Sequence, residues 1–543
     1  MDAQTFLDNF GTITETTGGV DRLRLLILNL AFGGQLTEVD SSDSETQVDL
    51  DQLGLSPAPE LTPPSRWRHV YLGEVAQVRL GRQRSPQRAT GDRMRPYLRA
   101  ANVTWAGLAL ADVKEMDFTA KESVSYELRP GDLLLSEASG SPMEVGKPAQ
   151  YRGEIDGCCF QNTLIRVRLP EDLSPDFYEW YFRQQALTGR FAENSRGVGI
   201  NHLGAKELAG WLIPVPSRSE QARIVARVEE LMQLCDELEA CQRARHHVTA
   251  RLLASSLDTL TSAETPDDLH SAWSRVRASW EALTDRPDSI AKLRSAILHL
   301  AARGKLVPQS EADEPAAVFL RELHQERLRR VGTARPRRGI AGAGEMSGEQ
   351  PYHLPSGWQW TTFAAASINR DSERVPVERS VRSQRQGPYD YYGASGVIDT
   401  IDHFLYDGDL LLIGEDGANL ALRSTPIAFM ATGRFWVNNH AHVIDSLSAD
   451  ALRYLAICVN SIDLKPFLTG IAQPKLNQRR MNEIPVPIPP AAEQARIVAK
   501  VDELMKLCDD LEACVLQRQA AHEAAAASII AHVTCTDYAD LAQ

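Results

Sequence analysis

The chain has 543 residues, 43% of them hydrophobic and 24% charged, a composition typical of a globular protein in water. It has no run of about 18 apolar residues and no basic N-terminal region before an apolar core, so we expect neither a membrane span nor a secretory signal. Eight cysteines without a CxxC pair argue against a disulfide scaffold or structural zinc, and we expect a reducing, cytoplasmic location. The net charge of −14 excludes simple nucleic-acid binding unless positive charge is concentrated locally.

The chain repeats itself. Residues 220–241 (EQARIVARVEELMQLCDELEAC) and 493–514 (EQARIVAKVDELMKLCDDLEAC) are identical at 18 of 22 positions. Upstream, residues 23–36 (LRLLILNLAFGGQL) match residues 293–306 (LRSAILHLAARGKL). The offsets of 273 and 270 residues are about half the chain. The sequence therefore predicts a tandem duplication.

The first half begins with a helical region over residues 1–37, where apolar side chains recur at helical spacing before Gly33-Gly34. Residues 38–63 are acidic and rich in proline, which indicates a linker. A mixed domain follows over residues 64–216, beginning with Pro-Ser-Arg-Trp. Its short apolar runs between Gly, Asp and Pro predict many short strands.

The second half has the same order. A central helical region spans residues 217–338 and contains a long helix over about 220–258. Residues 339–354 form a Gly-rich linker. A second mixed domain spans residues 355–490, beginning with Pro-Ser-Gly-Trp, and a second long helix occupies residues 491–543. Both mixed domains contain Gly-Asp-Leu-Leu-Leu, but their interiors otherwise diverge.

Both long helices carry a heptad pattern in which apolar residues step by four and three. The matching positions are Ile224, Val228, Leu231, Cys235 and Leu238, and Ile497, Val501, Leu504, Cys508 and Leu511. We expect an α+β protein in which two mixed α/β domains are separated by two long antiparallel coiled-coil helices, with an internal pseudo-two-fold tandem repeat. A homodimeric coiled coil is the alternative.

Positive charge is concentrated at the start of the first mixed domain. Residues 25–65 contain no Lys or Arg, whereas residues 66–99 contain nine arginines and two acids. The arginines are Arg66, Arg68, Arg79, Arg82, Arg84, Arg88, Arg93, Arg95 and Arg99. The corresponding stretch of the second half has five arginines diluted by three acids. Basic patches on an acidic chain are compatible with DNA binding, although an Arg-rich run taken alone is more often a solvated loop.

These motifs resemble the specificity subunit of Type I restriction-modification systems. Ile213-Pro-Val-Pro followed by Glu220-Gln-Ala-Arg-Ile-Val recurs as Ile484-Pro-Val-Pro followed by Glu493-Gln-Ala-Arg-Ile-Val. This junction closes the target recognition domains of that family, and the Pro-Ser-x-Trp openings match the start of such domains. The resemblance covers essentially the whole chain, and two copies at half-chain spacing make it specific.

The resemblance implies that each mixed domain reads one half of a split, asymmetric target in double-stranded DNA. The helices would set the gap between the half-sites and bind two N6-adenine methyltransferase subunits, through which restriction subunits join. The specificity subunit is not an enzyme in this family and binds no cofactor, whereas its partners use S-adenosylmethionine, ATP and magnesium. The sequence agrees with this, since it lacks a GxxxxGK[ST] loop and the methyltransferase tetrapeptide Asn/Asp-Pro-Pro-Tyr.

DNA reading requires Arg or Lys for guanine and phosphate and Asn or Gln for adenine. In the first mixed domain the candidates are Arg79, Arg82, Arg84, Arg99, Asn102, Lys147, Asn201 and His202. In the second they are Arg382, Arg385, Tyr391, Tyr392, Asn419, Asn438, Asn439, His440, Lys475 and Asn477. Glu415 and Asp416 orient these donors or accept from cytosine N4. His440 and His442 share one face of a strand, but no third metal ligand is evident.

Apolar residues off the heptad seam recur in both long helices and are candidates for docking the methyltransferase subunits. They are Val225, Met232, Leu234, Val498, Met505 and Leu507. The alternative is that they pack onto the mixed domains. Two other functions stay open at this point: an enzyme whose site lies in a mixed domain, and a coiled-coil adaptor that binds no DNA.

Overall fold

The computed structural model describes residues 10–41, 43, 67–85, 90–193, 201–284, 286–331, 350–470 and 473–539. Three predicted segments lie largely or wholly outside these residues: the linker 38–63, the opening residues 64–66, and the linker 339–354 up to residue 349. The chain divides into two compact units, Met1–Ala244 with Gln519–Gln543, and Arg245–Arg518. The boundary between the units falls inside the two long helices, α10 and α20.

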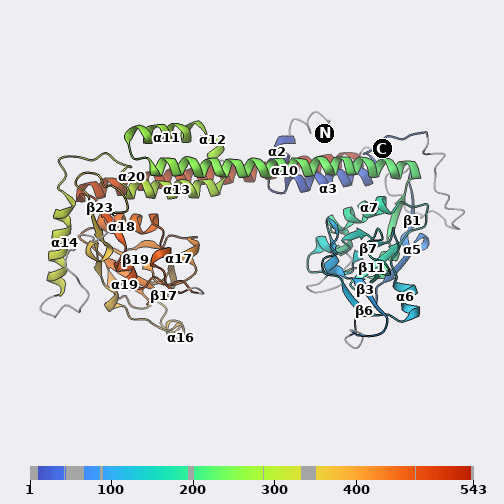
Figure 1. The fold of residues 1–543 in the computed structure, drawn as a ribbon, viewed down its shortest axis with the longest axis horizontal. Helices are drawn as coiled ribbons and strands as arrows, with labels where there is room; N and C mark the ends of the chain where they lie inside the picture. The colour runs from blue at the N-terminus through green and yellow to red at the C-terminus, as the bar shows by residue number, and fades with distance from the viewer. Residues whose placement is uncertain are drawn as a thin grey trace. The chain divides into compact units, whose positions relative to one another are not determined.

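The first mixed domain is built on a four-stranded antiparallel sheet in the order β2-β11-β7-β9. These strands are β2 (Gln77–Leu80), β11 (Leu164–Arg168), β7 (Leu133–Ser136) and β9 (Pro148–Gln150). Every residue of β7 is buried, because the Leu-Leu-Leu run is covered on both faces of the sheet. Leu133 and Leu135 pack with helix α7 (Pro175–Leu187), and Leu134 faces the opposite way. Figure 1 shows α7 beside β7 and β11.

Leu134 faces a second sheet in the order β10-β3-β6, where it packs with Leu98 and Phe160. These strands are β10 (Cys159–Phe160), β3 (Met94–Leu98) and β6 (Lys114–Asp117). Strands β1 (Arg68–Tyr71) and β13 (Leu212–Val215) pair antiparallel, so the chain enters and leaves the domain side by side. The shorter elements are α5 (Leu72–Val75), β4 (Val103–Thr104), β5 (Gly107–Leu108), α6 (Ala120–Tyr126), β8 (Ala138–Ser139), α8 (Arg190–Glu193), β12 (Asn201–His202) and α9 (Ala205–Ala209).

The second mixed domain has the same frame. Its four-stranded antiparallel sheet follows the order β15-β22-β19-β20, and α18 (Ala449–Ser461) covers the face that carries Leu411 and Ile413. The strands are β15 (Ile368–Asn369), β22 (Ala441–Asp445), β19 (Leu410–Gly414) and β20 (Ala428–Ala431). The closing pair is β14 (Gln359–Thr362) with β23 (Pro485–Ile488).

The second sheets of the two mixed domains differ, as the diverged interiors predict. In the second domain this sheet has four strands in the order β17-β16-β21-β18 and packs against Leu410 and Leu412. The strands are β16 (Tyr389–Gly393), β17 (Gly396–Ile401), β18 (Tyr406–Asp407) and β21 (Arg434–Val437). Short helices in this domain are α15 (Phe363–Ala366), α16 (Arg379–Arg382), α17 (Asn419–Leu422) and α19 (Gln478–Asn482).

The residues that the two halves share explain how each mixed domain joins its long helix. The tryptophan of each opening motif donates its indole N–H to the glutamate of the repeated EQARIV motif: Trp67 to Glu220 at 2.9 Å, and Trp358 to Glu493 at 3.0 Å. The glutamine that follows in each motif also binds the segment before the helix, because Gln221 donates to the carbonyl of Pro216. In the second half, Gln494 donates to the carbonyl of Pro489 in the same way. The repeated motifs therefore make the domain–helix joint.

The long helices are α10 (Arg218–Ser262) and α20 (Ala491–Ala539). The predicted heptad seam does not serve one purpose along its length. Ile224 and Val228 lie in the core of the first mixed domain, whereas Cys235 packs with α3 (Gly19–Phe32) and with Ala526 near the end of α20. In each unit, the first turns of the long helix therefore pack their heptad residues onto the mixed domain. An apolar stripe at helical spacing can pack against a domain core as well as against another helix.

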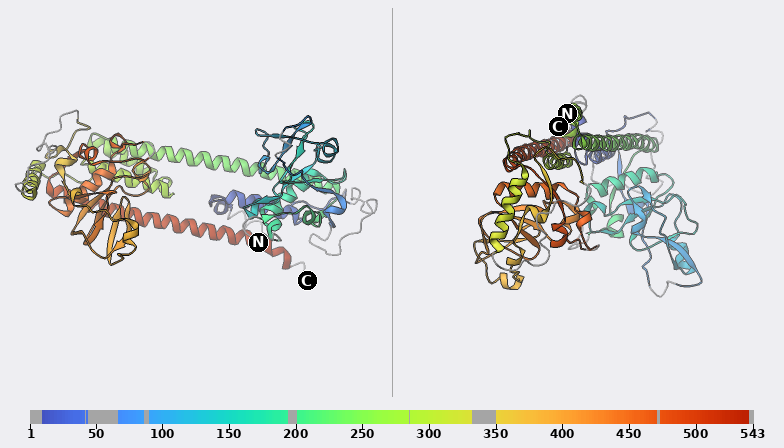
Figure 2. Two further views of the ribbon diagram at one scale, coloured as in Figure 1. Left: turned by 90° about the horizontal axis from the view of Figure 1, so that it is seen from below. Right: turned by 60° about the vertical axis from the view of Figure 1, so that its left-hand side comes forward.

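The remaining helices are α2 (Phe10–Glu15), α11 (Pro266–Ala278), α12 (Trp280–Leu283), α13 (Pro287–Ala302) and α14 (Ala316–Val331). In the second unit, α11 and α13 pack against the end of α10 through Leu253, Leu257 and Leu260. Figure 2 shows α14, in yellow, along the outside of the second mixed domain. Among the described helices, none is both long and apolar enough to cross a membrane.

Candidate nucleic-acid interface

Three of the predicted arginines lie on β2 and the loop after it, Arg79 on the strand and Arg82 and Arg84 on the loop, and they differ in exposure. Arg79 and Arg84 are exposed to solvent. Arg82 is only 7% exposed, donates from Nε to the Glu122 carboxylate at 3.0 Å and lies over the Phe118 ring. A guanidinium buried in an ion pair has no free edge for a base. The structure therefore corrects the prediction for Arg82, whose role is to anchor the loop.

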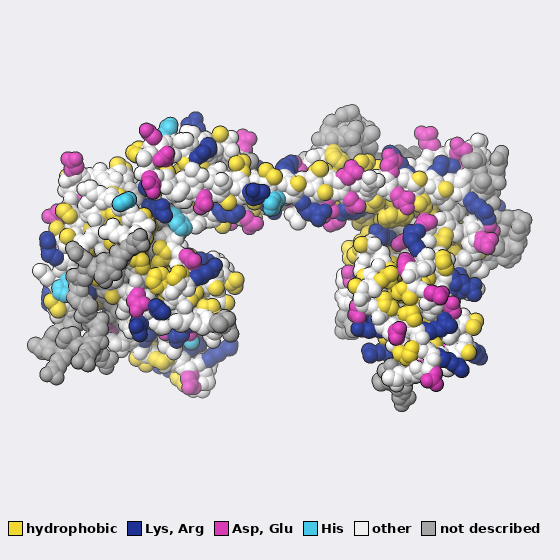
Figure 3. Space-filling model, in the orientation of Figure 1, with side chains coloured by type: hydrophobic (Ala, Val, Ile, Leu, Met, Phe, Trp, Pro, Cys, Tyr) yellow, Lys and Arg dark blue, Asp and Glu magenta, His cyan; other side chains and the backbone are white. Residues whose placement is uncertain are grey.

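Arg84 and Arg99 line a concavity of about 390 Å³ together with Lys114. Asp112 joins two of these cations, because it accepts from Arg99 at 2.5 Å and from Lys114 at 2.6 Å. The hydrogen bond from Lys114 and the positive charge of both partners lower the pKa of Asp112, so this carboxylate stays ionised. The walls include Tyr97, Gln161 and Thr163. Figure 3 shows Lys and Arg side chains gathered on the lower part of this domain.

Asn102, another candidate, is 2% exposed and shapes this region from within. Its side-chain amide donates to the carbonyls of Ala109 and Asp112, at 2.8 and 3.1 Å, and its oxygen accepts from the backbone of Arg99. A buried amide with these bonds has no capacity left for adenine. Asn102 is therefore a structural residue, which corrects the second of the predicted contacts in this domain.

Lys147 is largely buried: its ammonium group lies 5.7 Å from the centre of the Trp105 ring and 3.4 Å from Glu144. Asn201 and His202 form β12, which pairs with β8. The His202 ring is about half exposed, and its Nδ1 lies 3.3 Å from the Glu137 carboxylate. Asn201 and His202 therefore lie near the end of β7. They belong to the same domain as the loop after β2 but are distant from it in sequence.

In the second mixed domain, three segments far apart in sequence meet at the end of β19. The backbone N–H of Glu415 donates to the carbonyl of His440 at 2.8 Å, and that of Leu476 donates to the carbonyl of Glu415 at 2.8 Å. The Glu415 carboxylate is 12% exposed and accepts from Arg374 at 2.9 Å and from Lys475 at 3.2 Å. We call this meeting of residues 415–417, 438–440 and 474–477 the strand-end junction.

The strand-end junction exposes some of its polar side chains and buries others. Asn439 and His440 are exposed, with His440 Nδ1 2.8 Å from Asp416, and Lys475 is 48% exposed. Asn438 is 5% exposed and accepts from the backbone of His440. Asn477 caps α19 by accepting from the backbone of Arg480. The prediction of direct contact is thus corrected for Asn438, because its side chain faces the protein.

His442 does not share the exposed position of His440. It is fully buried, with Nδ1 2.6 Å from Asp371 and Nε2 2.8 Å from the Leu476 carbonyl. Burial alone would raise the pKa of Asp371, but its bonds to His442 and to the backbone of Val443 and the charge of Arg374 bring the pKa below its ordinary value. Among the described residues, no group of three or more His, Cys, Asp or Glu side chains is placed to bind a metal ion.

The other candidates of the second domain lie outside the strand-end junction or inside the core. Asn419 closes a turn by accepting from Ser424 and Thr425. Tyr391 is fully buried, and Tyr392 packs on Phe429 and Phe435, so the structure corrects the contact predicted for Tyr391.

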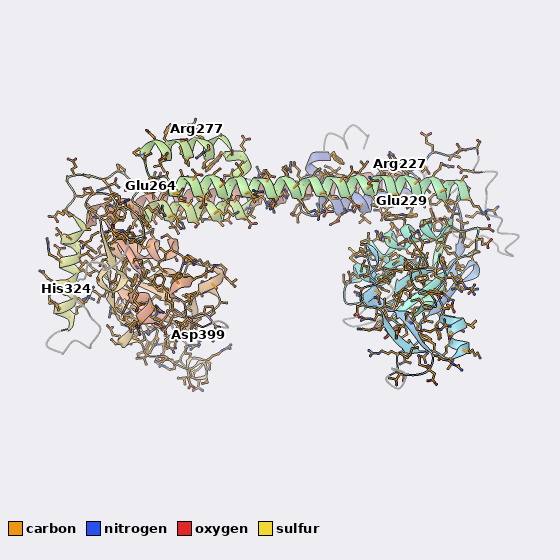
Figure 4. All side chains as sticks on the ribbon, in the orientation of Figure 1. Arg227, Glu229, Glu264, Arg277, His324 and Asp399 are labelled. Atoms are coloured by element: carbon orange, nitrogen blue, oxygen red, sulfur yellow. The ribbon has the colours of Figure 1, made fainter. Side chains whose placement is uncertain are left out.

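Arg382 lies over the Tyr391 ring and pairs with Asp399, which Figure 4 labels. Arg385 lies over the Trp436 ring and pairs with Asp402. Both arginines therefore line the sheet of β16 and β17 rather than the strand-end junction.

The first mixed domain has an equivalent junction, which sequence reasoning missed. Glu137 donates from its backbone to the Thr163 carbonyl at 2.9 Å and accepts from the backbone of Leu203 at 2.7 Å, the same two bonds that Glu415 makes. The side chain beside its carboxylate is the imidazole of His202 instead of the ammonium group of Lys475. The available signal was an acidic residue shortly after each Gly-Asp-Leu-Leu-Leu strand. The junctions thus share a backbone and differ in exposed side chains.

The predicted docking residues on the long helices are largely covered. Val225 and Met232 pack into the first mixed domain, and Val498 and Met505 into the second. Leu234 and Leu507, at equivalent positions, are 53% and 56% exposed. The structure therefore corrects four of the six predicted contacts, because the helix lies on its own mixed domain and uses these side chains there. This is the alternative that the sequence left open.

Comparisons with known proteins agree with this architecture. The family model described as the Type I restriction modification DNA specificity domain matches residues 64–245 and 370–518. The Type I restriction enzyme EcoEI specificity subunit of Escherichia coli is 22% identical over 552 residues, covering 91% of this chain and 90% of that protein. The EcoAI specificity subunit of the same species has the same identity and coverage.

A solved structure of the HsdS subunit from Thermoanaerobacter tengcongensis is also similar, with 17% identity and a TM-score of 0.39. The similarity covers 89% of this chain and 100% of that one. The two stretches that match the family model make up more than half of the chain. The chain therefore belongs to the Type I restriction-modification DNA specificity family.

Proposed function

We propose that this protein is the DNA sequence-specificity subunit of a Type I restriction-modification enzyme, in which each mixed domain reads one half of a bipartite, asymmetric DNA target. The observation that carries this proposal is the pair of equivalent junctions. Both have the same backbone bonds at the end of the central strand, but one exposes His202 and the other Lys475. A common frame with different donors suits the reading of two different sequences.

In this proposal the long helices set the separation of the half-sites. At about 1.5 Å per residue, a helix of the length of α10, 45 residues, extends about 68 Å. We propose an antiparallel pairing of α10 with α20, supported by the cluster of Cys235 with Ala526 in the first unit. The chain itself performs no catalysis and binds no cofactor. Two adenine methyltransferase subunits dock on it, restriction subunits join through them, and those partners use S-adenosylmethionine, ATP and magnesium.

A map of N6-methyladenine across the genome tests the proposal. The chain is produced in cells with the adenine methyltransferase subunit encoded beside it. We expect methylation at a split, asymmetric motif that disappears when this chain is deleted. Replacing residues 64–216 with the corresponding domain of a relative should change one half of the motif and leave the other. Methylation that persists unchanged without the chain would refute the proposal.

A further inference from the structure

Two arginines face each other across neighbouring strands of the first mixed domain. Arg79 on β2 and Arg166 on β11 are direct register partners in the antiparallel pair. Directly opposite residues point to the same face of a sheet, so these two positive charges lie side by side on one face. Like charges opposite each other destabilise a sheet unless an anion lies between or above them.

Aromatic rings hold the two guanidinium groups at this face. The guanidinium carbon of Arg79 lies 5.8 Å from the centre of the Tyr126 ring, and that of Arg166 lies 5.5 Å from the centre of the Phe160 ring. The two rings contact each other edge to face, with centres 5.8 Å apart. Arg79 is exposed, whereas Arg166 is 3% exposed. The arrangement therefore presents one accessible cation backed by one buried cation.

Arg166 keeps its charge although it makes no ion pair within the described residues. It donates to the carbonyls of Ser125 and Glu127, and its buried Nε has no hydrogen-bond partner. Burial and the charge of the neighbouring Arg168 lower its pKa to about 10, so it is still protonated at neutral pH. The nearby carboxylate of Asp132 is already bound by Arg168 at 2.6 Å. Positive charge at this face is therefore only partly neutralised.

In the second mixed domain, the arginine equivalent to Arg79 is paired with carboxylates of the same domain. Arg370 corresponds to Arg79: its backbone N–H donates to the carbonyl of Val443 on β22, and its guanidinium lies over the Tyr406 ring. Its side chain, however, pairs with Glu373 at 2.7 Å and lies 3.5 Å from Asp445. Val443 stands where the first domain has Arg166. The first domain thus lacks the carboxylates that serve the equivalent arginine in the second.

We propose that Arg79, backed by Arg166, forms an anion site that takes one phosphodiester group of the DNA backbone. This rests on the proposed function and adds to it a position outside the strand-end junction. Phosphate contacts orient a protein on the duplex without reading sequence. The site therefore contributes to affinity for any sequence, and it gives the first mixed domain a phosphate contact that the second lacks at the equivalent position.

The salt dependence of DNA binding tests this site. The full chain, in complex with its methyltransferase subunit, is titrated with target and scrambled duplexes at several salt concentrations. Each phosphate contact steepens the fall of log affinity with log salt by about 0.9. Over about a fourfold rise in salt, the unchanged chain should therefore lose about 3.5-fold more affinity than Arg79→Ala, on both duplexes. Arg79→Lys should restore most of the slope, because it retains the charge.

Arg370→Ala is the matched control, because its guanidinium is already paired with carboxylates, and it should leave the slope unchanged. An unchanged slope in Arg79→Ala overturns this site but not the proposed function, provided that the methyltransferase complex with the unchanged chain methylates its target. If that complex neither methylates nor binds any split target, the proposed function itself is overturned. Thermal unfolding with inorganic phosphate shows whether the site takes a free anion instead of DNA. The site binds free anions and not DNA if phosphate stabilises the unchanged chain but not Arg79→Ala, while both have the same salt slope for DNA binding.

Discussion

Replacing Glu415 with glutamine should disable the strand-end junction of the second mixed domain without changing its shape. The carboxylate accepts from two cations, Arg374 at 2.9 Å and Lys475 at 3.2 Å. An amide offers only one acceptor oxygen, so one of the two cations would face an N–H₂ group instead. A hydrogen bond to a charged group stabilises by about 1.5–3 kcal/mol, and Glu415→Gln should lose about that much locally.

The loss should appear in the reading of one half-site. Lys475 is 48% exposed and depends on Glu415 for its position. If the whole loss of about 1.5–3 kcal/mol is transferred to DNA binding, affinity for the target falls about 10- to 150-fold, which sets the upper limit. The assay compares duplexes altered in one half-site at a time, once the methylation map has defined both halves. We expect weaker discrimination in the half read by the second mixed domain only.

Glu137→Gln is the matched variant, because Glu137 has the same backbone bonds and stands beside His202. It should weaken discrimination in the other half-site. The melting temperature of each variant shows whether the domain remains folded. The reasoning is refuted if both folded variants discriminate both half-sites as well as the unchanged chain, or if both lose the same half.

Three further predictions concern stability. Met232→Ala should destabilise the first unit by about 2–5 kcal/mol, because the side chain lies in the domain core, whereas the exposed Leu234→Ala on the same helix should have little effect in thermal unfolding. Trp358→Phe should lower the denaturant midpoint, since it leaves buried Glu493 without its indole donor, at a cost of about 1–3 kcal/mol. Asp371 has a folded pKa below its ordinary value, so its stabilisation is present above pH 3.8 and is lost as the pH falls through the folded pKa. Asp371→Asn should therefore be less stable at neutral pH, and this difference should shrink in acid denaturation.

The sequence predicted the frame because the frame depends on patterns that recur. The Gly-Asp-Leu-Leu-Leu runs become the buried central strands β7 and β19. Short apolar runs of this kind, bounded by turn residues, are typical of strands that are buried on both faces. The duplicated helix motif likewise marks two long helices, α10 and α20. These patterns are local in the sequence, so a single sequence is enough to identify them.

Exposure of polar side chains could not be predicted in the same way. Arg82 is buried because it donates a hydrogen bond to the carboxylate of Glu122, 40 residues later, and Asn102 is buried because its amide donates to the carbonyl of Asp112. Neither partner is identified by sequence spacing. The heptad pattern predicted a contact between two helices along its whole length for a related reason. An apolar stripe on a helix has the same period whether it faces another helix or a domain core. Ile224 and Val228 follow the pattern but pack on the first mixed domain.

The duplication itself separates residues that build the frame from the residues that we propose read DNA. The bonds present in both halves join each mixed domain to its helix: Trp67 with Glu220 and Trp358 with Glu493 are one such pair. A substitution there should weaken either half alike, because the same joint exists twice. The side chains that differ at equivalent positions, such as His202 against Lys475, lie at the exposed ends of a shared backbone. Under the proposed function, a change there should leave the frame intact and act on one half-site, which is the condition for a tandem protein to acquire a new target one half at a time.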